Sequence, residues 1–283
     1  TKVYSKEEFD RIGHGGTEQF GALSYKPGFA INPLKFVNGI TKYAISKKLA
    51  IFEHSLVNKI HKNNDSYILR TKEGSVNTKK IVVATNGFYQ EGLIPQMNSR
   101  ILPVISNIIV TRKLTNNEID LHNFKTFSPI ANTKNLLYYY RKLPDNRILF
   151  GTRGDFVGSD QSNLNRSKIM ERFLKKIFPS WSNVSIDYNW RGLIAMSQKL
   201  TPSIGKIENE EIYYGFGYHG VGVSSAPWTG KQLSKIVFSS NSKDLNISKI
   251  YKGLPKKFIF PKLRIFYFRL AVMFYNIKDK LNI

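Results

Sequence analysis

The alternation of apolar and polar residues near the end of the chain predicts a strand, a glycine-rich loop and a helix. Glu211–Tyr214 is apolar and aromatic after its first residue, as expected for a buried strand. Four glycines follow within Gly215–Gly222. Residues at helical spacing come next and predict a helix over 223–238: Val223, Ala226, Gly230, Leu233 and Val237.

The glycines of this loop allow its backbone to approach a ligand closely, because they carry no Cβ atom. The helix that follows adds free N–H groups and a partial positive charge. Such a loop suits an electron-rich, flat or anionic group, and the pyrimidine ring of a flavin is one example. A tight turn that joins a strand to a helix without any ligand explains the same spacing.

The first hundred residues predict an α/β arrangement. Leu34–Leu49 has the pattern of an amphipathic helix, with one apolar face made of Leu34, Val37, Ile40, Ala44 and Ile45. Residues 50–54 and 56–57 indicate a strand, and 67–71 with 75–76 indicate a hairpin. Residues 79–84 form a short apolar strand that ends in Thr85-Asn86-Gly87, which is typical of a ligand-facing sheet edge.

The middle of the chain has a different pattern, which predicts an inserted antiparallel sheet. Strands are expected over 104–112, 136–141 and 147–150, with a turn at Pro144-Asp145-Asn146 between the last two. Residues 164–178 read as a helix that ends near Pro179. Before residue 35 the sequence shows turn signals only, at Gly13–Gly16, Gly21, Pro27-Gly28 and Asn32-Pro33.

Length and charge place limits on this picture. The 283 residues suffice for one large domain or two interleaved ones. The formal charge of +23 is compatible with binding to nucleic acid or an anionic membrane. The basic residues are, however, spread along the chain without a zinc-finger, RRM or helix-turn-helix pattern. Compositional drift therefore explains the charge better, and we expect no nucleic-acid partner.

The cysteine and histidine content excludes several kinds of chemistry. The sequence has no cysteine, which excludes disulfides, thiolate zinc sites, thiol catalysis and a cysteine-linked cofactor. His14, His54, His61 and His122 are scattered without ligand spacing, so we expect no metal. Thr1 in place of a methionine favours a fragment of a longer protein, and the first 30 residues lack the apolar core of a signal peptide.

The C-terminal tail, residues 241–283, is basic and aromatic. Residues 265–277 are strongly apolar but contain Arg269, and the stretch is too short to cross a bilayer. Packing onto the rest of the protein is one interpretation. A helix lying on a membrane surface is the other.

Three segments together resemble one family: Tyr43–Gly87, Tyr140–Gly151 and Trp190–Gly222. Their order and spacing resemble the FAD-dependent D-amino-acid oxidase superfamily, closest to the branch of γ-glutamylputrescine oxidase. The resemblance covers most of residues 5–240. It implies a mixed α/β fold in which a glutathione-reductase-like FAD domain, lacking its first βαβ unit, is interleaved with a substrate domain containing an antiparallel or mixed sheet. The FAD domain would comprise 31–93 and 188–240, and the substrate domain 1–30 and 94–187.

The sequence departs from the family where the family binds the pyrophosphate of FAD. Family members begin with a strand, Gly-x-Gly-x-x-Gly and a helix, followed by an acidic residue for the ribose. This sequence does not begin with such an arrangement, and Gly13-His-Gly-Gly16 is no substitute because it does not follow an apolar strand. The resemblance therefore implies an N-terminally truncated member that binds FAD poorly by itself.

The resemblance also implies roles for individual residues around a non-covalently bound FAD. Val57 would meet the adenine, and four residues would line the ADP half: Ala84, Thr85, Asn86 and Gly87. The pyrimidine end would lie against the loop 217–222, with Gly217, Gly220, Val221 and Gly222 closest. Three residues would approach the ring from the side: Trp190, Arg191 and Gly192.

Candidate substrate residues are Tyr140, Arg141 and Arg153 on the inserted sheet, with Tyr218 and His219 in the glycine loop. An arginine on the sheet could hold a substrate carboxylate in bidentate fashion, although a surface arginine is the plainer interpretation in so basic a chain. His219 could contact the substrate or tune the flavin. It could equally be a loop histidine whose hydrogen bonds are all made within the protein.

The implied reaction is oxidation of a CH–NH or CH–NH2 group in an amine or amino acid. A γ-glutamylputrescine-like compound is one example of such a substrate. Hydride would pass to flavin N5, water would hydrolyse the imine, and oxygen would reoxidise the flavin. Alternatives are a dehydrogenase that passes electrons to a membrane quinone, with the tail as its docking surface, an inactive remnant, and a non-enzymatic basic module. We expect a bacterial, cytoplasmic protein. The basic aromatic tail suggests an alternative, in which the protein makes peripheral contact with the inner face of the membrane.

Overall fold

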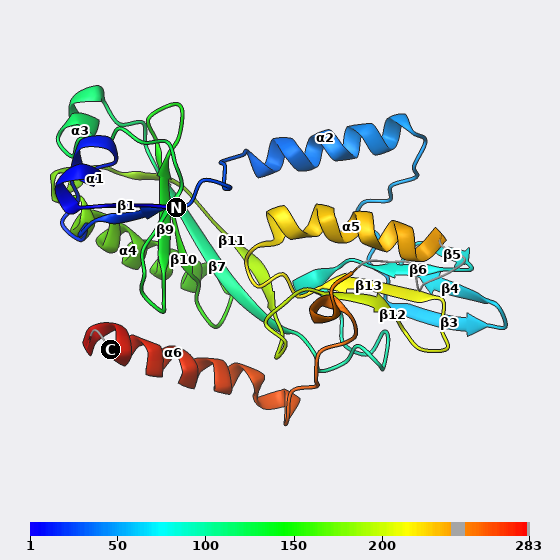
Figure 1. Ribbon diagram of the computed structural model, residues 1–283. Helices are drawn as coiled ribbons and strands as arrows, with labels where there is room; N and C mark the ends of the chain where they lie inside the picture. Colours follow the sequence, from blue (N-terminus) through cyan, green and yellow to red (C-terminus); the bar gives the residue numbers. More distant parts are fainter. Residues whose placement is uncertain (239–246, 282–283) are drawn as a thin grey trace. The chain divides into compact units, whose positions relative to one another are not determined.

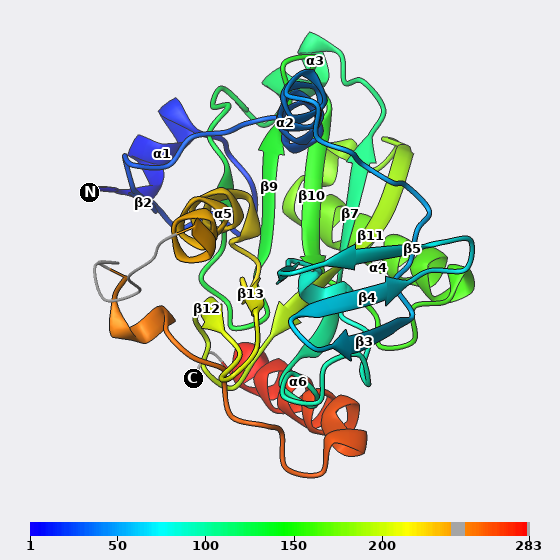
Figure 2. The same cartoon turned by 90° about the vertical axis from the view of Figure 1, so that its right-hand side faces the viewer.

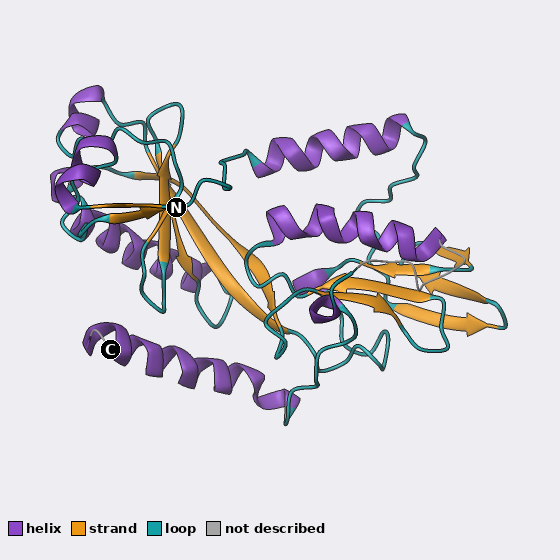
Figure 3. Ribbon diagram, in the orientation of Figure 1, coloured by secondary structure: helices purple, strands orange, loops and turns teal. Residues whose placement is uncertain are grey.

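The computed structural model describes residues 1–238 and 247–281 and shows a mixed α/β protein with four sheets (Figures 1 and 3). The mixed α/β class expected from the sequence is confirmed. The chain divides into two compact units. The first, called here the sheet unit, comprises 1–31, 105–192 and 267–283, and the second, the loop unit, comprises 32–104 and 193–266. Their assignment to substrate and FAD stays a prediction.

The sheet unit is built on a five-stranded sheet in the order β11-β7-β10-β9-β8. The strands are β7 (Leu102–Thr111), β8 (Ile130–Ala131), β9 (Tyr138–Lys142), β10 (Ile148–Arg153) and β11 (Ile186–Met196). β10 pairs antiparallel with both β7 and β9. The three strands expected in this region are therefore confirmed. So is the turn before β10, where Asn146 adopts a φ of +63° that asparagine tolerates well.

Helices complete this unit and close its core. α4 (Asp160–Ile177) begins at Ser159, whose hydroxyl accepts a hydrogen bond from the Ser162 N–H. It buries Met170, Leu174 and Ile177, which lie on one face of the helix. The short helices α3 (Asn116–Asp120) and η2 (Pro179–Trp181) also belong to this unit. Aromatic residues from the sheet, from η2 and from the segments next to the two short helices fill the core, among them Phe124, Tyr140, Phe150, Phe178 and Trp181.

The N-terminal elements were missed by the sequence reasoning. β1 (Lys2–Tyr4) pairs antiparallel with β2 (Ala22–Ser24), and α1 (Lys6–Ile12) lies between them. α1 starts in a capping box in which the Ser5 hydroxyl accepts from the Glu8 N–H and the Glu8 carboxylate accepts from the Ser5 N–H. The Ser-x-x-Glu pattern is a known signal for a helix start. It was outweighed by the many turn residues nearby.

His14 lies in the middle of the aromatic core of the sheet unit and is 1% exposed. Its Nε2 is 2.7 Å from the Tyr140 hydroxyl, and its Nδ1 accepts a hydrogen bond from the Gly16 N–H at 3.1 Å. Burial, with a smaller contribution from the neighbouring His122, lowers the pKa of His14 to about 4. The imidazole is therefore neutral at pH 7, because a buried positive charge there has no carboxylate to offset it.

We expect the protein to lose stability as the pH falls from 6.5 to 4. The pKa of His14 is lower in the folded state than in the unfolded chain, so its contribution is complete above the unfolded value and is lost below it. The loss is on the order of 3 kcal/mol at most. Urea unfolding at several pH values measures it. His14→Gln should flatten the profile, whereas exposed His54→Gln should not, and a wild-type profile that is already flat would contradict this account.

The loop unit contains two three-stranded sheets. One is a meander of β3 (Lys59–Asn63), β4 (Ser66–Arg70) and β5 (Ser75–Thr78), which confirms the expected hairpin. The other has the order β12-β13-β6, from β12 (Ser203–Lys206), β13 (Ile212–Phe216) and β6 (Ile81–Val83). α5 (Gly222–Phe238) packs Leu233 and Val237 with Ile204 and Tyr213 of this sheet.

Two expectations near the start of the loop unit meet different outcomes. The helix at 34–49 is present as α2 (Pro33–Ser46), with Asn32 as its N-cap, and it ends three residues early. The strand expected at 50–54 and 56–57 is wrong, because residues 49–58 form no strand. An extended segment becomes a strand only when a neighbour satisfies its backbone groups, and no neighbour is present for it among the described residues. Val57 therefore does not follow a strand.

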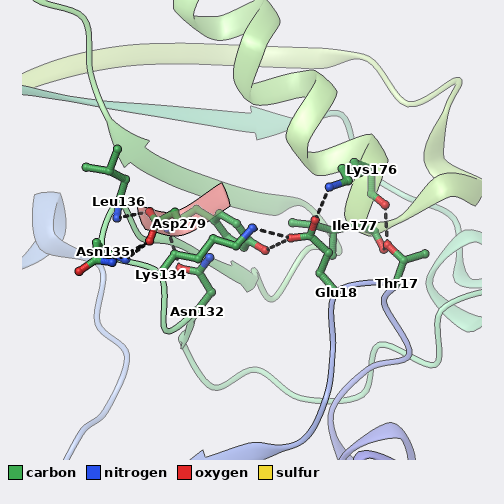
Figure 4. Close-up of polar contacts among 10 residues, drawn as sticks. Thr17, Glu18, Asn132, Lys134, Asn135, Leu136, Lys176, Ile177 and Asp279 are labelled. Atoms are coloured by element: carbon green, nitrogen blue, oxygen red, sulfur yellow. Dashed lines mark hydrogen bonds and ion pairs between the residues drawn. The ribbon is translucent and has the colours of Figure 1, made fainter. Parts of the chain in front are cut away.

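The tail ends in α6 (Arg264–Leu281), after the short helices η4 (Lys249–Tyr251) and η5 (Pro261–Leu263). Residues 241–246 of the predicted tail lie outside the described residues. Near the end of α6, the Asp279 carboxylate accepts hydrogen bonds from the N–H groups of Asn135 and Leu136 at 2.8 and 2.9 Å (Figure 4). In the part of the chain that the structure describes, no helix is long and apolar enough to span a membrane.

The half-buried carboxylate of Glu18 holds the beginning of the chain to β9 and α4. Glu18 accepts a hydrogen bond from the Tyr138 hydroxyl at 2.7 Å and pairs with Lys176 at 2.6 Å (Figure 4). Burial raises the pKa of Glu18, but the hydrogen bonds from Lys176 and Tyr138 and the lysine charges outweigh it and lower the pKa to about 2. The carboxylate is therefore ionised at neutral pH.

Candidate functional site

Two parallel strands of the loop unit end at the same edge of their sheet. β6 and β13 pair with Ile81 opposite Ile212 and Val83 opposite Tyr214, so their carboxyl ends point the same way. Segment 84–87 follows the first strand and segment 217–221 the second. The Asn86 side-chain oxygen accepts a hydrogen bond from the Gly217 N–H at 3.0 Å. Two residues that are 131 positions apart in the sequence are thereby joined at the edge where parallel sheets bind ligands.

The turn after β6 has an unusual backbone that its residues suit. Asn86 has a φ of +48° and starts the short helix η1 (Asn86–Phe88). Gly87 is buried against the chain at Leu193, and a Cβ added to it would lie 3.1 Å from the Leu193 Cβ. Ala84 and Thr85, by contrast, are exposed. The turn is thus fixed from behind while its first residues stay open to a ligand.

The loop between β13 and α5 is a run of left-handed backbone. Gly217 and Gly220 have φ values of +79° and +94°, and His219 between them has +50°. Glycine adopts this conformation without a steric penalty, which explains its use here. The Val221 N–H donates to the Tyr218 carbonyl at 2.9 Å and closes the turn. The predicted strand, loop and helix are all present, and α5 begins at Gly222.

The N-terminus of α5 adds positive potential to this loop. N–H groups in the first turn of a helix have no partner inside the helix, and the helix dipole is positive there. The Ser224 and Ser225 hydroxyls donate to the Val221 carbonyl at 3.1 and 2.6 Å, so they do not occupy these N–H groups. The first turn of α5 can therefore stabilise negative charge on a group that lies against the loop.

His219 is a polar residue of this loop, and one nitrogen of its ring has no hydrogen-bond partner among the described residues. Its N–H donates to the Ala195 carbonyl at 3.3 Å, and its Nε2 lies 3.2 Å from the Ser197 hydroxyl. Its Nδ1 is buried and has no partner among the described residues. Burial lowers the pKa of His219, so the ring is neutral at pH 7. A neutral imidazole can donate or accept one hydrogen bond from the second nitrogen, according to its tautomer.

Ser197 and Tyr218 lie next to His219, and the sequence indicated a role at the site for only one of them. Ser197 was not anticipated, since a lone serine outside any motif carries no signal. Tyr218 was expected at the substrate, but it is 8% exposed and its hydroxyl donates to the Gly215 carbonyl at 3.3 Å. A role for Tyr218 at the substrate stays a prediction. It requires the Tyr218 hydroxyl to leave the Gly215 carbonyl and to bond to the substrate instead.

In the sheet unit, Arg153 belongs to a cluster of arginines around Phe156. The guanidinium carbons of Arg153 and Arg269 lie 5.1 and 5.5 Å from the centre of the Phe156 ring. Burial, and then the charge of Arg153, lowers the pKa of Arg166 to about 10. The Nε atoms of Arg153 and Arg166 are buried and unpaired among the described residues. The Asp155 carboxylate lies close enough to Arg153 and Arg166 to offset part of their charge. The positive charge that remains, with its free donors, suits an anion such as a carboxylate.

The other predicted substrate residues of the sheet unit have partners in the protein. Tyr140 is 6% exposed, with its hydroxyl bonded to His14. Burial raises the pKa of the Tyr140 hydroxyl far above its usual range. Arg141 donates from one guanidinium nitrogen to the Ile31 carbonyl at 3.0 Å. Arg166, which completes the arginine cluster, was missed because α4 carries basic residues along most of its length.

The segment Trp190–Gly192 lies on β11 at the end of the sheet unit. Trp190 is 44% exposed, and a Cβ added to Gly192 would meet nothing within 4 Å. Arg191 donates to the Ser159 carbonyl at 2.7 Å and pairs with Asp160 at 3.1 Å. The open surface around Trp190 and Gly192 leaves room for a ligand, and their role beside a flavin stays a prediction.

Metal ligands do not gather at either place. Across residues 1–238 and 247–281, no group of three or more His, Asp or Glu side chains could hold a metal ion. The buried side-chain atoms that lack a protein partner at these two places are His219 Nδ1, the Nε atoms of Arg153 and Arg166, and one carboxylate oxygen of Asp155. Together with the N–H groups of the loop, donors outnumber acceptors, which suits an anionic or electron-rich organic group.

Comparison with known proteins identifies the family. The family described as FAD dependent oxidoreductase (DAO) matches residues 2–236. The chain therefore belongs to the DAO family of FAD-dependent oxidoreductases, which confirms the resemblance drawn from the sequence.

Curated relatives of this chain include two bacterial oxidoreductases. The chain is 28% identical to the probable oxidoreductase OrdL of Haemophilus influenzae over 249 residues, covering 84% of this chain and 56% of that protein. It is 26% identical to the gamma-glutamylputrescine oxidoreductase of Escherichia coli over 266 residues, covering 93% and 60%. The chain thus spans about three fifths of the length of the curated relatives it matches.

Solved structures share the fold. The glycine oxidase of Geobacillus kaustophilus superposes with a TM-score of 0.69 at 16% identity, over 83% of this chain and 62% of that one. The L-proline dehydrogenase of P. horikoshii superposes with a TM-score of 0.68 at 19% identity, over 86% and 65%. At this identity the likeness establishes the fold and nothing finer.

The residues present fit one end of an FAD molecule. The left-handed loop 217–221 leaves its backbone open, the first turn of α5 supplies positive potential, and His219 Nδ1 lacks a partner. The exposed Ala84 and Thr85 lie on the chain next to Asn86, which bonds the loop. The one Gly-x-Gly-x-x-Gly of the sequence, Gly215-x-Gly217-x-x-Gly220, is this same loop, and the sequence offers no second turn of this kind. The loop can therefore fit one group of the cofactor, and its assignment to the flavin ring stays a prediction.

Proposed function

We propose that this chain carries the flavin-ring end of an FAD site and the substrate side of an amine or amino-acid oxidoreductase. The supporting observation is the hydrogen bond between Asn86 and Gly217, which joins the two predicted cofactor segments at one sheet edge. Family membership supplies the cofactor. The bound flavin would accept the hydride removed from the carbon next to the amine nitrogen. The FAD is held without a covalent bond in this proposal.

The chain's own residues would then perform three tasks. The loop N–H groups and the first turn of α5 would stabilise negative charge at the pyrimidine ring, since they are fixed in place before the ring enters. His219, held by Ser197 and by its own N–H, would direct Nδ1 toward a polar atom of the ring or of the substrate. No strong general base is required when the amine enters in its neutral form.

The substrate proposed is an amine or amino acid, with γ-glutamylputrescine-like compounds as the first candidates. Gamma-glutamylputrescine oxidoreductase and glycine oxidase are both among the curated relatives. The arginine cluster around Phe156 would hold a carboxylate on such a substrate, with Arg153 as the residue most directly implicated. We place the protein in the cytoplasm of a bacterium in this proposal.

The test requires a complete cofactor site. The chain should be joined behind the part of E. coli gamma-glutamylputrescine oxidoreductase that it does not match, and the product loaded with FAD. Under anaerobic conditions, γ-glutamylputrescine or a related amine should bleach the visible absorbance of the flavin. A loaded protein that no amine or amino acid bleaches would contradict the proposal. Oxygen uptake after the reaction would identify the acceptor.

In that loaded protein, Arg153→Ala should raise KM for an amine that carries a carboxylate. Loss of one charge-assisted pair costs about 1.5–3 kcal/mol, which corresponds to roughly tenfold or more in KM. The same variant should leave KM unchanged for an amine without a carboxylate. Lys168→Ala, an exposed lysine on α4, serves as the control. An unchanged KM for the acidic amine would remove Arg153 from the substrate site.

A membrane quinone as electron acceptor is a second candidate, favoured by one observation on α6. Its exposed apolar residues recur at helical spacing: Phe266, Leu270, Met273, Phe274, Ile277 and Leu281. Such a stripe with lysines near its end can lie in the surface of an anionic membrane. We expect the protein to sediment with anionic vesicles and Met273→Asp/Phe274→Asp to weaken this, while Phe20→Asp does not. Equal sedimentation of all three proteins would favour oxygen as acceptor and α6 as a packing helix.

A further inference from the structure

The sheet β12-β13-β6 of the loop unit buries a different cluster on each of its faces. α5 covers one face, where it packs with Tyr213 of β13. Tyr214 belongs to the other face, because side chains alternate along a strand, and it lies there in one buried cluster with Ile94 and Met97 from the segment that leads into β7. Both views show α5 on one side of β12 and β13 and this segment on the other (Figures 1 and 2).

A cavity of about 600 Å³ lies on the face away from α5. Its volume is that of an ordinary small-molecule site. Three stretches of the loop unit line it, within residues 95–100, 206–214 and 253–257. The lining has an apolar part, made of Pro95, Ile207 and Leu254, and a polar part that includes Arg100, Lys206, Glu208, Tyr214 and Lys257. None of these residues belongs to the candidate flavin site.

Tyr214 presents an unpaired hydroxyl to this cavity. The residue is 2% exposed, and its hydroxyl makes no hydrogen bond to a described residue. Gly205, opposite it on β12, makes room for the hydroxyl, since a Cβ there would lie 2.5 Å from the hydroxyl oxygen. Burial raises the pKa of Tyr214 to about 12, although the charge of Arg100 acts the other way. The hydroxyl is therefore protonated at pH 7, and a tyrosine this deeply buried normally has a partner for it.

The backbone fixes Arg100 in the lining of the same cavity. Its Nε donates to the Gln96 carbonyl at 2.5 Å, and its Nη1 donates to the Pro255 carbonyl. Both acceptors are neutral, and among the described residues no carboxylate lies within ion-pair distance of Arg100. The guanidinium is thus held in place with its charge uncompensated and with Nη2 still able to donate, which is the state that suits recognition of an anion.

The charges around the cavity leave one positive charge to be neutralised. The lining cations are Arg100, Lys206 and Lys257, and the lining anion is Glu208. A second carboxylate, Glu211, pairs with Lys206. Three positive charges therefore face two negative ones. A single carboxylate balances the difference, whereas a phosphate ester brings close to two negative charges at neutral pH and fits less well.

We propose that this cavity is a second binding site, for a small organic molecule with one carboxylate and an apolar body. The carboxylate accepts hydrogen bonds from Arg100 and from the Tyr214 hydroxyl, and Lys257 adds to the positive potential. The apolar body lies against Ile207 and Leu254. No flavin takes part in this binding, so failure of the proposed function would leave the site in place.

The experiment is an NMR titration of the nitrogen-labelled full chain with pentanoate, and 1-pentanol is the uncharged control. Pentanoate should shift the backbone amide signals of Tyr214 and Gly253 in a saturable way, with a dissociation constant on the order of 1 mM. Pentanol should shift neither. Tyr214→Phe should weaken pentanoate binding about tenfold, because a hydrogen bond to a charged group is lost. Its urea midpoint should equal that of the unsubstituted chain, because the hydroxyl has no protein partner to lose.

Two neighbouring lysines separate this site from general attraction of anions to a basic protein. Lys257 lines the cavity and Lys256 does not, and both are exposed. Lys257→Gln should weaken pentanoate binding about twofold or more, and Lys256→Gln should leave it unchanged. Arg153→Ala, in the sheet unit, should not alter the shifts of Tyr214 and Gly253. The proposal is overturned if a folded chain shows no saturable shifts there, if the two lysine variants act alike, if Tyr214→Phe binds as well as the unsubstituted chain, or if the shifts depend on Arg153.

Discussion

Titration of this chain alone with FAD should show weak binding, with a dissociation constant above about 100 μM. In the proposed function the flavin ring occupies the loop 217–222, which is part of the one Gly-x-Gly-x-x-Gly of the sequence (Gly215, Gly217 and Gly220), so no second glycine-rich turn of this kind is left for the pyrophosphate. Each charge-assisted hydrogen bond to a phosphate is worth about 1.5–3 kcal/mol, and losing several of them weakens binding by a thousandfold or more. Fluorescence quenching of FAD measures the constant.

The comparison ligand in this titration is riboflavin, which has the ring without the pyrophosphate. If only the ring is held, FAD and riboflavin should bind this chain with similar affinity. Tight, stoichiometric binding of FAD would contradict the account, since it would require a pyrophosphate site among residues that show none of the expected sequence features. Binding of adenosine diphosphate alone would also contradict the expectation that only the ring is held.

Replacing Gly215 by valine should destabilise the loop unit by about 4 kcal/mol or more. A Cβ at this position would lie 2.5 Å from the Thr229 Cγ2 and 2.8 Å from the Leu233 Cδ1. Both side chains are buried on the face of α5 that packs on β13, so neither can move without separating helix and sheet. The loop that follows Gly215 depends on this packing for its position. Urea unfolding followed by circular dichroism measures the loss.

Gly230 provides the matched control within α5. A Cβ added there would meet nothing within 4 Å, and the residue is exposed. Gly230→Val should therefore change stability by no more than about 0.5 kcal/mol, because valine and glycine differ little in helix propensity. Equal effects of the two substitutions would show that the contact between β13 and α5 does not hold the loop.

The local parts of the candidate site were predictable from the sequence. The strand, loop and helix around Gly215–Gly222 are carried by apolar periodicity and by glycine, which are local signals. The same holds for the short strand before Asn86 and the hairpin of the meander. Their meeting was not predictable from spacing, because the bond between Asn86 and Gly217 depends on the parallel pairing of β6 and β13. The family resemblance supplied that link in advance.

The wrong and missed predictions have a common physical cause. The structure that a segment adopts, and the role of a side chain, depend on neighbours that are distant in the sequence. Residues 50–54 have the composition of a strand, but strand formation needs a neighbour that the described residues do not supply. Ser197 and Arg166 matter only through contacts with His219 and Arg153, and an isolated serine or arginine gives no sequence signal. Tyr140 is a candidate substrate residue of the inserted sheet by the sequence, yet its hydroxyl lies 2.7 Å from His14 Nε2 in the core.

We propose that the loop beside Asn86 holds the ring of a flavin, and NMR of the nitrogen-labelled chain during titration with riboflavin tests this. The backbone amide signals of Gly217, Gly220 and Gly222 should shift together with saturable dependence on riboflavin, along with the side-chain amide of Asn86. Shifts that are absent from these groups, or that fall instead on Gly13–Gly16, would contradict it.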